Sequence, residues 1–398
     1  MMTRTHPVRF LTPAFLGNAE QCGQWRTPPF KAQLRQWWRV AYAADCGYRV
    51  DLQAMRREEG LLFGNAWLSH RENGREVADH RKSLLRLRLG KWTEGLLTSW
   101  GGLEQGKINH PEAEKAKHEV GPHAYLGYGP LDGRGNTKFS RKNNAAIQAG
   151  ESATLSLAVP TTHKNAELRH LLENNGPRIE RSLWLMDRYG TVGGRSRNGW
   201  GSYTLLPLPP GEDQYEGIAF AGEPPLRPWH DCLQLDWPHA IGKDEQGPLI
   251  WETAPHGDWK SLMRTLAIIK IGLRTQFVFP TPPHVHPLPR HWLSYPITRH
   301  STKRFDRNAR LPNQLRFKVR ATAEGRLIGV IFHVPHLPPA AFRPNRHAIT
   351  ATWKSVHRLL DELTRPAPRG YTSITDSTRR AQLKPQLDSI ASLRRISE

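Results

Sequence analysis

The sequence contains few cysteines and no long apolar run. Its three cysteines, Cys22, Cys46 and Cys232, are widely spaced and odd in number. They provide neither a disulfide framework nor a paired-cysteine metal site, and they indicate a reducing compartment. No apolar stretch of about 18 residues is present to span a membrane, and the N-terminal residues lack the apolar core of a signal peptide. We therefore expect a cytoplasmic protein with no membrane partner.

Acidic residues are also scarce. The chain of 398 residues has 36 Asp and Glu against 57 Lys and Arg, which gives a formal net charge of +21. A surplus of this size repels itself and is most simply explained by a polyanionic partner. The 14 tryptophans and a hydrophobic content of 38% predict sizeable cores. The length favours two domains.

The first half alternates strand and helix patterns. We expect strands near residues 8–17, 84–90 and 151–159, and a fourth after the glycine-rich stretch at 192–202. A helix should begin near Pro28, and its cations recur every fourth residue, at Lys31, Arg35 and Arg39. A second helical region, 163–189, should break at Gly176-Pro177. A long insertion at about 101–150 includes the basic residues Arg134, Lys138, Arg141 and Lys142.

The second half follows a Pro-rich linker at 209–229. Residues 258–277 predict a buried helix, 315–320 and 325–334 a β-hairpin, and 349–363 an amphipathic helix. We assign a C-terminal domain to 230–363 and a flexible or partner-docking basic tail to 364–398. The fold class is therefore α+β. The element order predicts two tandem ferredoxin-like (RRM-like) domains, at 1–208 and 230–363, with a glycine-rich loop and a long insertion.

The stretch VGGRSRNGWGS, residues 192–202, is the first candidate binding motif. Its glycines, Gly193, Gly194, Gly199 and Gly201, permit a backbone whose N–H groups cradle an anion. Arg195 and Arg197 offer bidentate phosphate contacts, and Trp200 offers a stacking face for a base. The alternative is a tight helix-to-strand turn in which the glycines only solve a packing problem. The stretch is neither a Walker A motif nor a dinucleotide fingerprint.

A second basic region spans residues 290–320, with nine Lys and Arg against Asp306 alone. It includes Arg304 and ends in an alternating strand, LRFKVR. Leu315, Phe317 and Val319 should point inward, which leaves Arg316, Lys318 and Arg320 together on the opposite face. Such a face suits single-stranded nucleic acid or, equally, an acidic protein surface.

Metal and catalytic motifs are weak. His284, His286 and His291 lie close in sequence but have no companion carboxylate or cysteine cluster, so we expect no metal and no cofactor. We find no nucleophile motif. His70, His123 and Asp45 could serve RNA cleavage, which needs only a positioned acid or base, but nothing in the sequence selects one of them.

Several separated motifs together resemble one family. In the N-terminal half they are Phe10, Thr12-Pro13, Phe15, Gly17, Arg26, Pro28, Leu34-Arg35, Trp37-Trp38-Arg39 and LFG at 62–64. They continue with GGRSRNGWGS, with DWPHAIG at 236–242, and with RLPNQLRFKV before a glycine-turn hairpin. Over about residues 8–360 the chain resembles the RAMP superfamily of CRISPR–Cas proteins. Within it, the chain is most similar to the first-subunit family of Cmr-type (type III-B) effector complexes.

This resemblance implies a non-catalytic RNA-binding subunit at the end of a filament built on CRISPR RNA, near the guide 3′ end. Such a subunit contacts other RAMP subunits and helps engage single-stranded target RNA. The resemblance carries over residues 193–202 as the glycine-rich loop, and Arg35 and Arg39 as helix positions near RNA. Asn198 stands where the family often has arginine, and Trp200 where phenylalanine is common.

Two other functions stay open. One is a metal-independent RAMP endoribonuclease that processes or cleaves RNA itself. The other is an assembly subunit whose basic surfaces bind only acidic protein partners.

Overall fold

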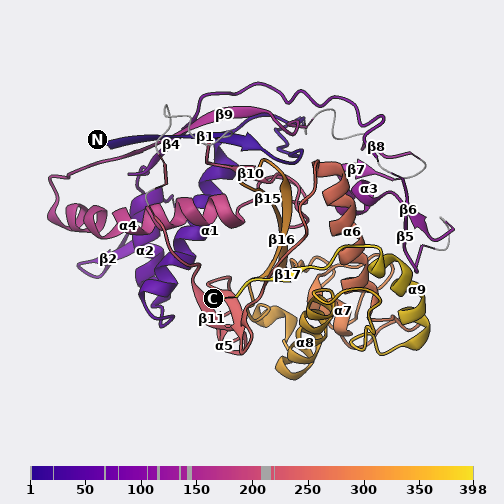
Figure 1. The fold of residues 1–398 in the computed structure, drawn as a ribbon. Coiled ribbons are helices and arrows are strands. Elements are labelled where there is room, and N and C mark those ends of the chain that lie inside the picture. Colours follow the sequence, from indigo (N-terminus) through magenta and orange to yellow (C-terminus); the bar gives the residue numbers. More distant parts are fainter. Residues whose placement is uncertain are drawn as a thin grey trace.

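The computed structural model describes residues 2–20, 22–66, 69–78, 80–104, 106–113, 117–133, 136–140, 146–207, 217–218 and 220–397. It is an α+β fold, as the sequence predicts, with a four-stranded antiparallel sheet in each half of the chain. Figure 1 shows the first sheet along the upper edge and the second between two groups of helices. In the part of the chain described, no helix is long and apolar enough to cross a membrane.

The first sheet has the strand order β10-β1-β9-β4. Its elements follow one another as β1 (Met2–Phe10), α1 (Thr27–Asp45), β4 (Arg86–Leu89), β9 (Ser152–Val159), α4 (Ala166–Tyr189) and β10 (Tyr203–Thr204). The fourth strand of this βαββαβ order therefore lies beside the first. Helix α1 begins at a Pro-Pro pair, whose missing N–H groups suit a first turn. Its apolar stripe, which includes Leu34, Trp37 and Trp38, is buried as predicted.

The predicted break in α4 is wrong, because the helix runs through Pro177 without ending. Proline removes one backbone donor from a helix. A side-chain contact with α1 supports the helix at this position. Asn175 accepts a hydrogen bond from Trp38 Nε1 at 2.8 Å and donates to the Leu171 carbonyl at 2.8 Å. Tertiary packing thus outweighs the local preference of Gly176-Pro177.

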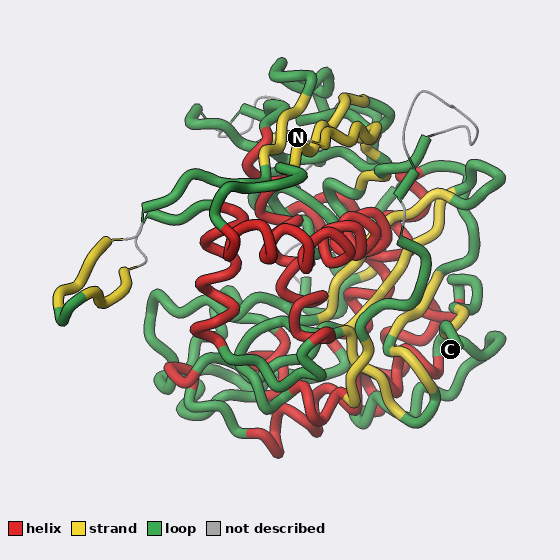
Figure 2. The backbone as a smooth tube through the Cα atoms, turned by 90° about the vertical axis from the view of Figure 1, so that its left-hand side faces the viewer, coloured by secondary structure: helices red, strands yellow, loops and turns green. Residues whose placement is uncertain are grey.

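Two elements extend the first half away from its sheet. Helix α2 (Leu52–Phe63) packs beside α1. The hairpin β2 (Ser69–Glu72) and β3 (Arg75–Ala78) stands away from the rest of the chain at the left of Figure 2.

The second sheet repeats the same arrangement, with the order β15-β16-β14-β17. Its elements are β14 (Ile250–Glu252), α6 (Trp259–Thr275), β15 (Leu315–Ala321), β16 (Leu327–His333), α8 (Arg346–Glu362) and β17 (Arg394–Arg395). The predicted buried helix, the hairpin and the amphipathic helix are all confirmed. Again the fourth strand lies beside the first.

The prediction of a flexible or partner-docking tail at 364–398 is wrong, because this segment is folded into the second half. Residues 364–398 contain α9 (Ser377–Asp388) and β17, which is the fourth strand of the second sheet. Their basic residues pair with buried or half-buried acids: Arg395 bonds to Asp361 at 3.0 Å and also to Asp244. Leu383 and Leu387 of α9 enter the core. The folded second half of the chain thus continues well beyond residue 363.

Smaller elements fill the connections. In the insertion these are β5 (Ile108–Asn109), β6 (Glu119–Val120), α3 (Pro122–Gly127), β7 (Leu131–Asp132) and β8 (Lys138–Phe139). In the second half they are β11 (Leu226–Pro228), α5 (Trp229–Cys232), β12 (Ile241–Asp244), β13 (Gly247–Pro248), α7 (Pro289–Leu293) and a 3₁₀ turn, Ala340–Phe342. The insertion packs on the second half through α3 and α6. Residues 209–216 and 219 of the predicted linker lie outside the described residues, and its end forms β11 and the start of α5.

Helices cover both faces of the second sheet. On one face, Phe317, Val319 and Ile331 share a core with α6 and α8. On the other face, Phe332 lies 5.0 Å from Tyr189 of α4 and 6.4 Å from Trp37 of α1, measured between ring centroids. Figure 1 shows β15 and β16 between these two helix groups. The two halves therefore share an extensive apolar interface.

Candidate nucleic-acid interface

The glycine-rich loop joins α4 to β10 at the junction of the two halves. Its backbone bonds to the segment after β1: Gly194 N–H donates to Phe15 O and Gly201 N–H to Pro13 O, each at 2.9 Å. On the other side, Phe317 N–H of β15 donates to Arg197 O at 3.1 Å. The loop therefore contacts both halves of the chain.

The glycines of this loop are required by packing. Gly201 has φ +65°, and a Cβ there would lie 1.8 Å from Val192 O. Gly193 has φ +93°, and its Cβ would lie 2.7 Å from Phe15 O. The N–H groups of Gly194, Gly199 and Gly201 are already bonded to carbonyls of the protein. The predicted anion cradle is therefore wrong for these three amides, and the alternative of a packed helix-to-strand turn holds for the glycines.

Trp200 is fully buried, so the prediction of an exposed stacking face is also wrong. Its ring centroid lies 5.3 Å from that of Phe15, 5.5 Å from Trp100 and 5.9 Å from Trp259. Trp100 directly precedes the insertion, and Trp259 is the first residue of α6. Trp200 thus belongs to the core that holds the insertion against both halves.

The two arginines of the loop line a large cleft. It has a volume of about 1510 Å³ and lies between the loop, the insertion, α6 and the segments at 294–298 and 310–313. Its walls carry six cationic side chains, of Lys107, Arg195, Arg197, Lys270, Arg274 and Arg310. They carry only two carboxylates, of Glu119 and Asp132. Glu119 lies 3.5 Å from Lys107, so the remaining charge of the cleft is strongly positive.

Three of these cations gather beside the loop. Burial lowers the pKa of Arg195, and the neighbouring Arg274 lowers it further. Burial lowers the pKa of Lys270 well below its ordinary value, with Arg274 and then Arg195 adding to the effect. Among the described residues, Arg195 and Arg274 have no hydrogen-bond or ion-pair partner for their guanidinium groups. Like charges held together in a partly buried site cost free energy, which an anionic ligand would offset.

Asn198 supports this group. Its Oδ1 accepts a hydrogen bond from Lys270 Nζ, and its Nδ2 donates to Leu126 O at 2.6 Å. Arg197 is more constrained, because its Nη1 donates to Asn313 O at 3.2 Å. At the position where the resemblance leads one to expect an arginine, this chain therefore carries an amide that holds a lysine from α6.

Tyrosines complete the walls. Tyr125 and Tyr128 come from the insertion, and Tyr295 comes from the second half. The side chain of Tyr128 is 59% exposed, so its ring is available for stacking. Sequence reasoning missed these tyrosines together with Lys270, Arg274 and Arg310. One signal was present: Lys270 and Arg274 are cations four residues apart in the mainly apolar second half of α6.

The stripe on α1 lies elsewhere and is largely paired. Arg35 Nε donates to Glu59 Oε1 at 2.9 Å, and Arg39 bonds to both oxygens of Glu59 at 2.9–3.0 Å. Glu59 is a buried residue of α2. The two arginines thus clamp α1 to α2, although their side chains remain 34% and 44% exposed. Lys31 has a lowered pKa, caused by burial and then by Arg35.

The cationic strand face of β15 is not a surface. Lys318 is fully buried, and its Nζ donates to the carbonyls of Gly190, at 2.6 Å, and Tyr203. Arg316 is 8% exposed, and Arg320 Nη1 lies 3.4 Å from Glu252 Oε1. The prediction of an open platform fails because α1 and α4 cover this face. Burial lowers the pKa of Lys318 to about 7.

The other predicted RNA-binding residues do not line the cleft. Arg304 and Lys138 are exposed elsewhere, and Arg134 and Arg141 lie outside the described residues. Among the candidate acid–base groups, His123 is buried and Asp45 pairs with Arg178 at 2.7 Å. Of His70 the structure describes only the backbone.

Two of the three histidines considered as metal ligands, His284 and His291, contact His300. His284 Nε2 lies 2.9 Å from His300 Nδ1, and His291 Nε2 lies 2.7 Å from His300 O. No group of three potential metal ligands occurs within the described ranges.

Comparisons with known proteins give structural matches only. No family model matches the sequence, and no curated protein matches it. The crystal structure of Cmr1 from Pyrococcus furiosus in its apo form matches with a TM-score of 0.41 and 14% identity, covering 89% of this chain and 97% of that one.

A chain in the cryo-EM structure of the Type III-B Cmr-beta bound to cognate target RNA matches with a TM-score of 0.44 and 10% identity. The match covers 88% of this chain and 99% of that one. A further Cmr-beta structure, with target RNA and AMPPnP in the presence of ssDNA, has a TM-score of 0.38 at 10% identity. At these scores the function has to be argued from the residues of this chain.

Proposed function

We propose that this chain is a non-catalytic RNA-binding subunit of a type III CRISPR RNA-guided effector complex, and that the cationic cleft is its RNA site. The observation that carries the proposal is the group of Arg195, Lys270 and Arg274. Two of these cations have no partner among the described residues, and they stand close to an exposed tyrosine, Tyr128. Phosphate groups satisfy such guanidiniums, and a base can stack on the ring.

The repeated sheet order supports the fold part of the proposal. Each half has a βαββαβ order, and in each the fourth strand pairs with the first. This arrangement is that of a ferredoxin-like domain, so we assign two such domains in tandem. The cleft opens beside the glycine-rich loop, which contacts both of these domains.

The chemistry of the cleft suits RNA whose sequence is read by another molecule. Arginine and lysine contacts to phosphate carry no base specificity, and stacking on tyrosine tolerates every base. A protein that binds a guide or its target in this way leaves sequence recognition to base pairing. The sequence motifs described above support an effector-complex subunit in particular.

The position in the complex follows from the same resemblance. We place the chain at the filament end near the guide 3′ end, where it helps engage single-stranded target RNA and contacts other RAMP subunits. A site that binds both strands through phosphate contacts would serve that position.

Incubation of the purified chain with single-stranded RNA in the presence of a chelator tests the function class. We expect binding that weakens steeply with salt and leaves the RNA intact. Reproducible RNA cleavage that tracks the protein through purification would instead identify a metal-independent endoribonuclease. Absence of RNA binding, together with retained assembly on partner subunits, would identify an assembly subunit.

A further inference from the structure

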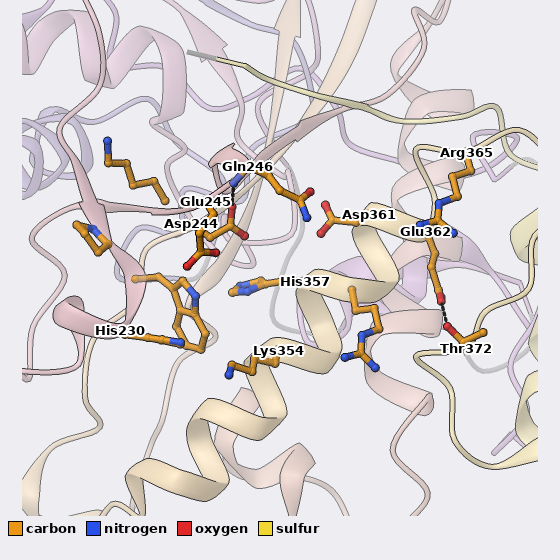
Figure 3. A pocket seen from close by; sticks show the side chains of 14 residues that line it. His230, Asp244, Glu245, Gln246, Lys354, His357, Asp361, Glu362, Arg365 and Thr372 are labelled. Atoms are coloured by element: carbon orange, nitrogen blue, oxygen red, sulfur yellow. Dashed lines mark hydrogen bonds between the residues drawn. The ribbon is translucent and has the colours of Figure 1, made fainter.

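A second pocket lies on the second half, between α5, the β12–β13 turn and α8. Its volume is about 880 Å³, within the range of small-ligand sites. Figure 3 shows His357 at its centre, with His230 on the opposite wall and Lys354 from the same helix. Neither the cleft nor the proposed RNA contacts include these residues.

Three of the four carboxylates that line the pocket are already paired, whereas the fourth, of Glu245, lies exposed on the β12–β13 turn. Asp361 accepts hydrogen bonds from Trp251 Nε1 at 2.9 Å and from Arg395 at 3.0 Å. Asp244 pairs with Arg395, and Glu362 accepts from Thr372 at 2.6 Å. These acids anchor the C-terminal segment to the rest of the domain. The charge left for a ligand is therefore mainly cationic.

The unoccupied donors lie at the other end of the pocket. Lys354, His357 and Arg358 are spaced i, i+3 and i+4 on α8, so they share one face of the helix. In the described part of the chain, the side chains of Lys354, Arg358 and His230 have no hydrogen-bond or ion-pair partner. Three positively charged or protonatable groups thus line the pocket without pairing with any described acidic side chain.

His357 provides a buried donor at the same place. The residue is 5% exposed and lines the pocket. Its Nε2 lies 2.9 Å from His333 Nδ1, while its Nδ1 has no partner among the described residues. Burial lowers the pKa of His357 to about 3, with smaller effects from Arg395 and His230, so the ring is neutral at physiological pH.

The partner histidine fixes the tautomer of His357. His333 Nε2 is buried without a hydrogen bond. Buried N–H groups without a partner are rarer than unpaired acceptors, so the proton of His333 belongs on Nδ1, from which it donates to His357 Nε2. The proton of His357 then lies on Nδ1 and points into the pocket. His333 is a positioning residue in this arrangement.

We propose that the pocket between α5 and α8 binds a phosphate group through His357 Nδ1–H, Lys354, Arg358 and His230. The phosphate is either a free small anion or the terminal phosphate of a nucleotide chain. Both share the same oxygen acceptors, and a neutral N–H beside two cations suits a dianion without excess buried charge.

Titration of the full-length chain with inorganic phosphate, followed by ³¹P NMR, tests the proposal. Asparagine places an amide donor near the position of His Nδ1, whereas glutamine places it near Nε2. We expect His357→Gln and Lys354→Ala to weaken phosphate binding about tenfold or more. His357→Asn should bind phosphate nearly as the wild type does. Arg346→Ala, an exposed arginine on the same helix outside the pocket, is the matched control and should have no effect.

The source of the phosphate is distinguished in an Arg195→Ala/Arg274→Ala background, in which the cleft is impaired. A 5′-phosphorylated oligonucleotide that binds more tightly than its 5′-hydroxyl counterpart would identify a chain terminus. Equal binding of the two, with binding of inorganic phosphate retained, would identify a free anion. Thermal unfolding of His357→Gln checks that the variant folds.

The proposal is overturned if the folded wild type shows no phosphate binding at about 10 mM. It is also overturned if His357→Gln and Lys354→Ala bind phosphate as tightly as the wild type.

Discussion

Replacing Arg274 by alanine should weaken RNA binding without destabilising the protein. Arg274 lines the cleft beside Arg195 and Lys270, and none of the described carboxylates pairs with it. A hydrogen bond to a charged group contributes about 1.5–3 kcal/mol. If Arg274 contacts one phosphate, its loss should weaken single-stranded RNA binding by between about tenfold and a hundredfold.

The salt dependence gives a second magnitude. Each neutralised phosphate of a single strand contributes about −0.7 to the slope of log affinity against log salt concentration. Arg274→Ala should therefore make the slope shallower by about 0.7. Removal of one member of a group of like charges relieves repulsion, so the melting temperature should be unchanged or higher.

Fluorescence anisotropy with a labelled single-stranded RNA, measured at several salt concentrations, provides both quantities. Arg346→Ala is again the control, because this arginine is exposed and lies outside the cleft. The reasoning is refuted if Arg274→Ala keeps wild-type affinity and slope. A lower melting temperature with unchanged RNA binding would show instead that Arg274 is structural.

Four further substitutions test the framework around the site by thermal or denaturant unfolding. Gly201→Ala places a Cβ 1.8 Å from Val192 O at a positive φ, so it should lower the free energy of unfolding by about 2 kcal/mol or more. Gly176→Ala has open space around it inside α4, so it should raise the free energy of unfolding by up to about 1 kcal/mol. Arg395→Ala leaves Asp361 and Asp244 without their shared partner, so it should lower the free energy of unfolding by about 3 kcal/mol. An unchanged unfolding midpoint would mean that β17 does not hold the second sheet. The lowered pKa of Lys318, about 7, means that the unfolded chain binds more protons between pH 7 and about 10.5. Wild-type stability should therefore rise with pH across this window relative to Lys318→Met, and parallel pH profiles would contradict the assignment.

Most of the fold could be predicted from local patterns. The periodic apolar stripe identified α1, alternation identified β9 and the β15–β16 hairpin, and a continuous apolar stretch identified α6. The strand β17 could not be found in this way, because it consists of Arg394–Arg395 alone and forms only against β14. Its two arginines pair with Glu252 and with acids of β12 and α8, which a basic composition does not reveal.

The candidate site was predicted in part, through Arg195 and Arg197. Alternation along β15 separates two faces of a strand but does not distinguish a solvent face from one that another domain covers. Lys318 is buried for that reason. Trp200 is buried because rings distant in sequence, such as Trp100 and Trp259, close over it.

The cleft itself depends on long-range packing. Lys270 belongs to a helix that reads as core, and only the fold brings it to Asn198 and Arg195. The tyrosines arrive from the insertion and from the second half. No local pattern links these segments, so their convergence had to come from the structure.

The central claim, that RNA occupies the cleft between the two halves, is tested most directly by photo-cross-linking of the full-length chain to 4-thiouridine-labelled single-stranded RNA with peptide mapping. The account predicts intact RNA cross-linked to the peptides that carry Tyr125 and Tyr128 or Tyr295, with the signal reduced in Arg195→Ala/Arg274→Ala. Cross-links that map only outside the cleft and do not change in that variant would contradict it.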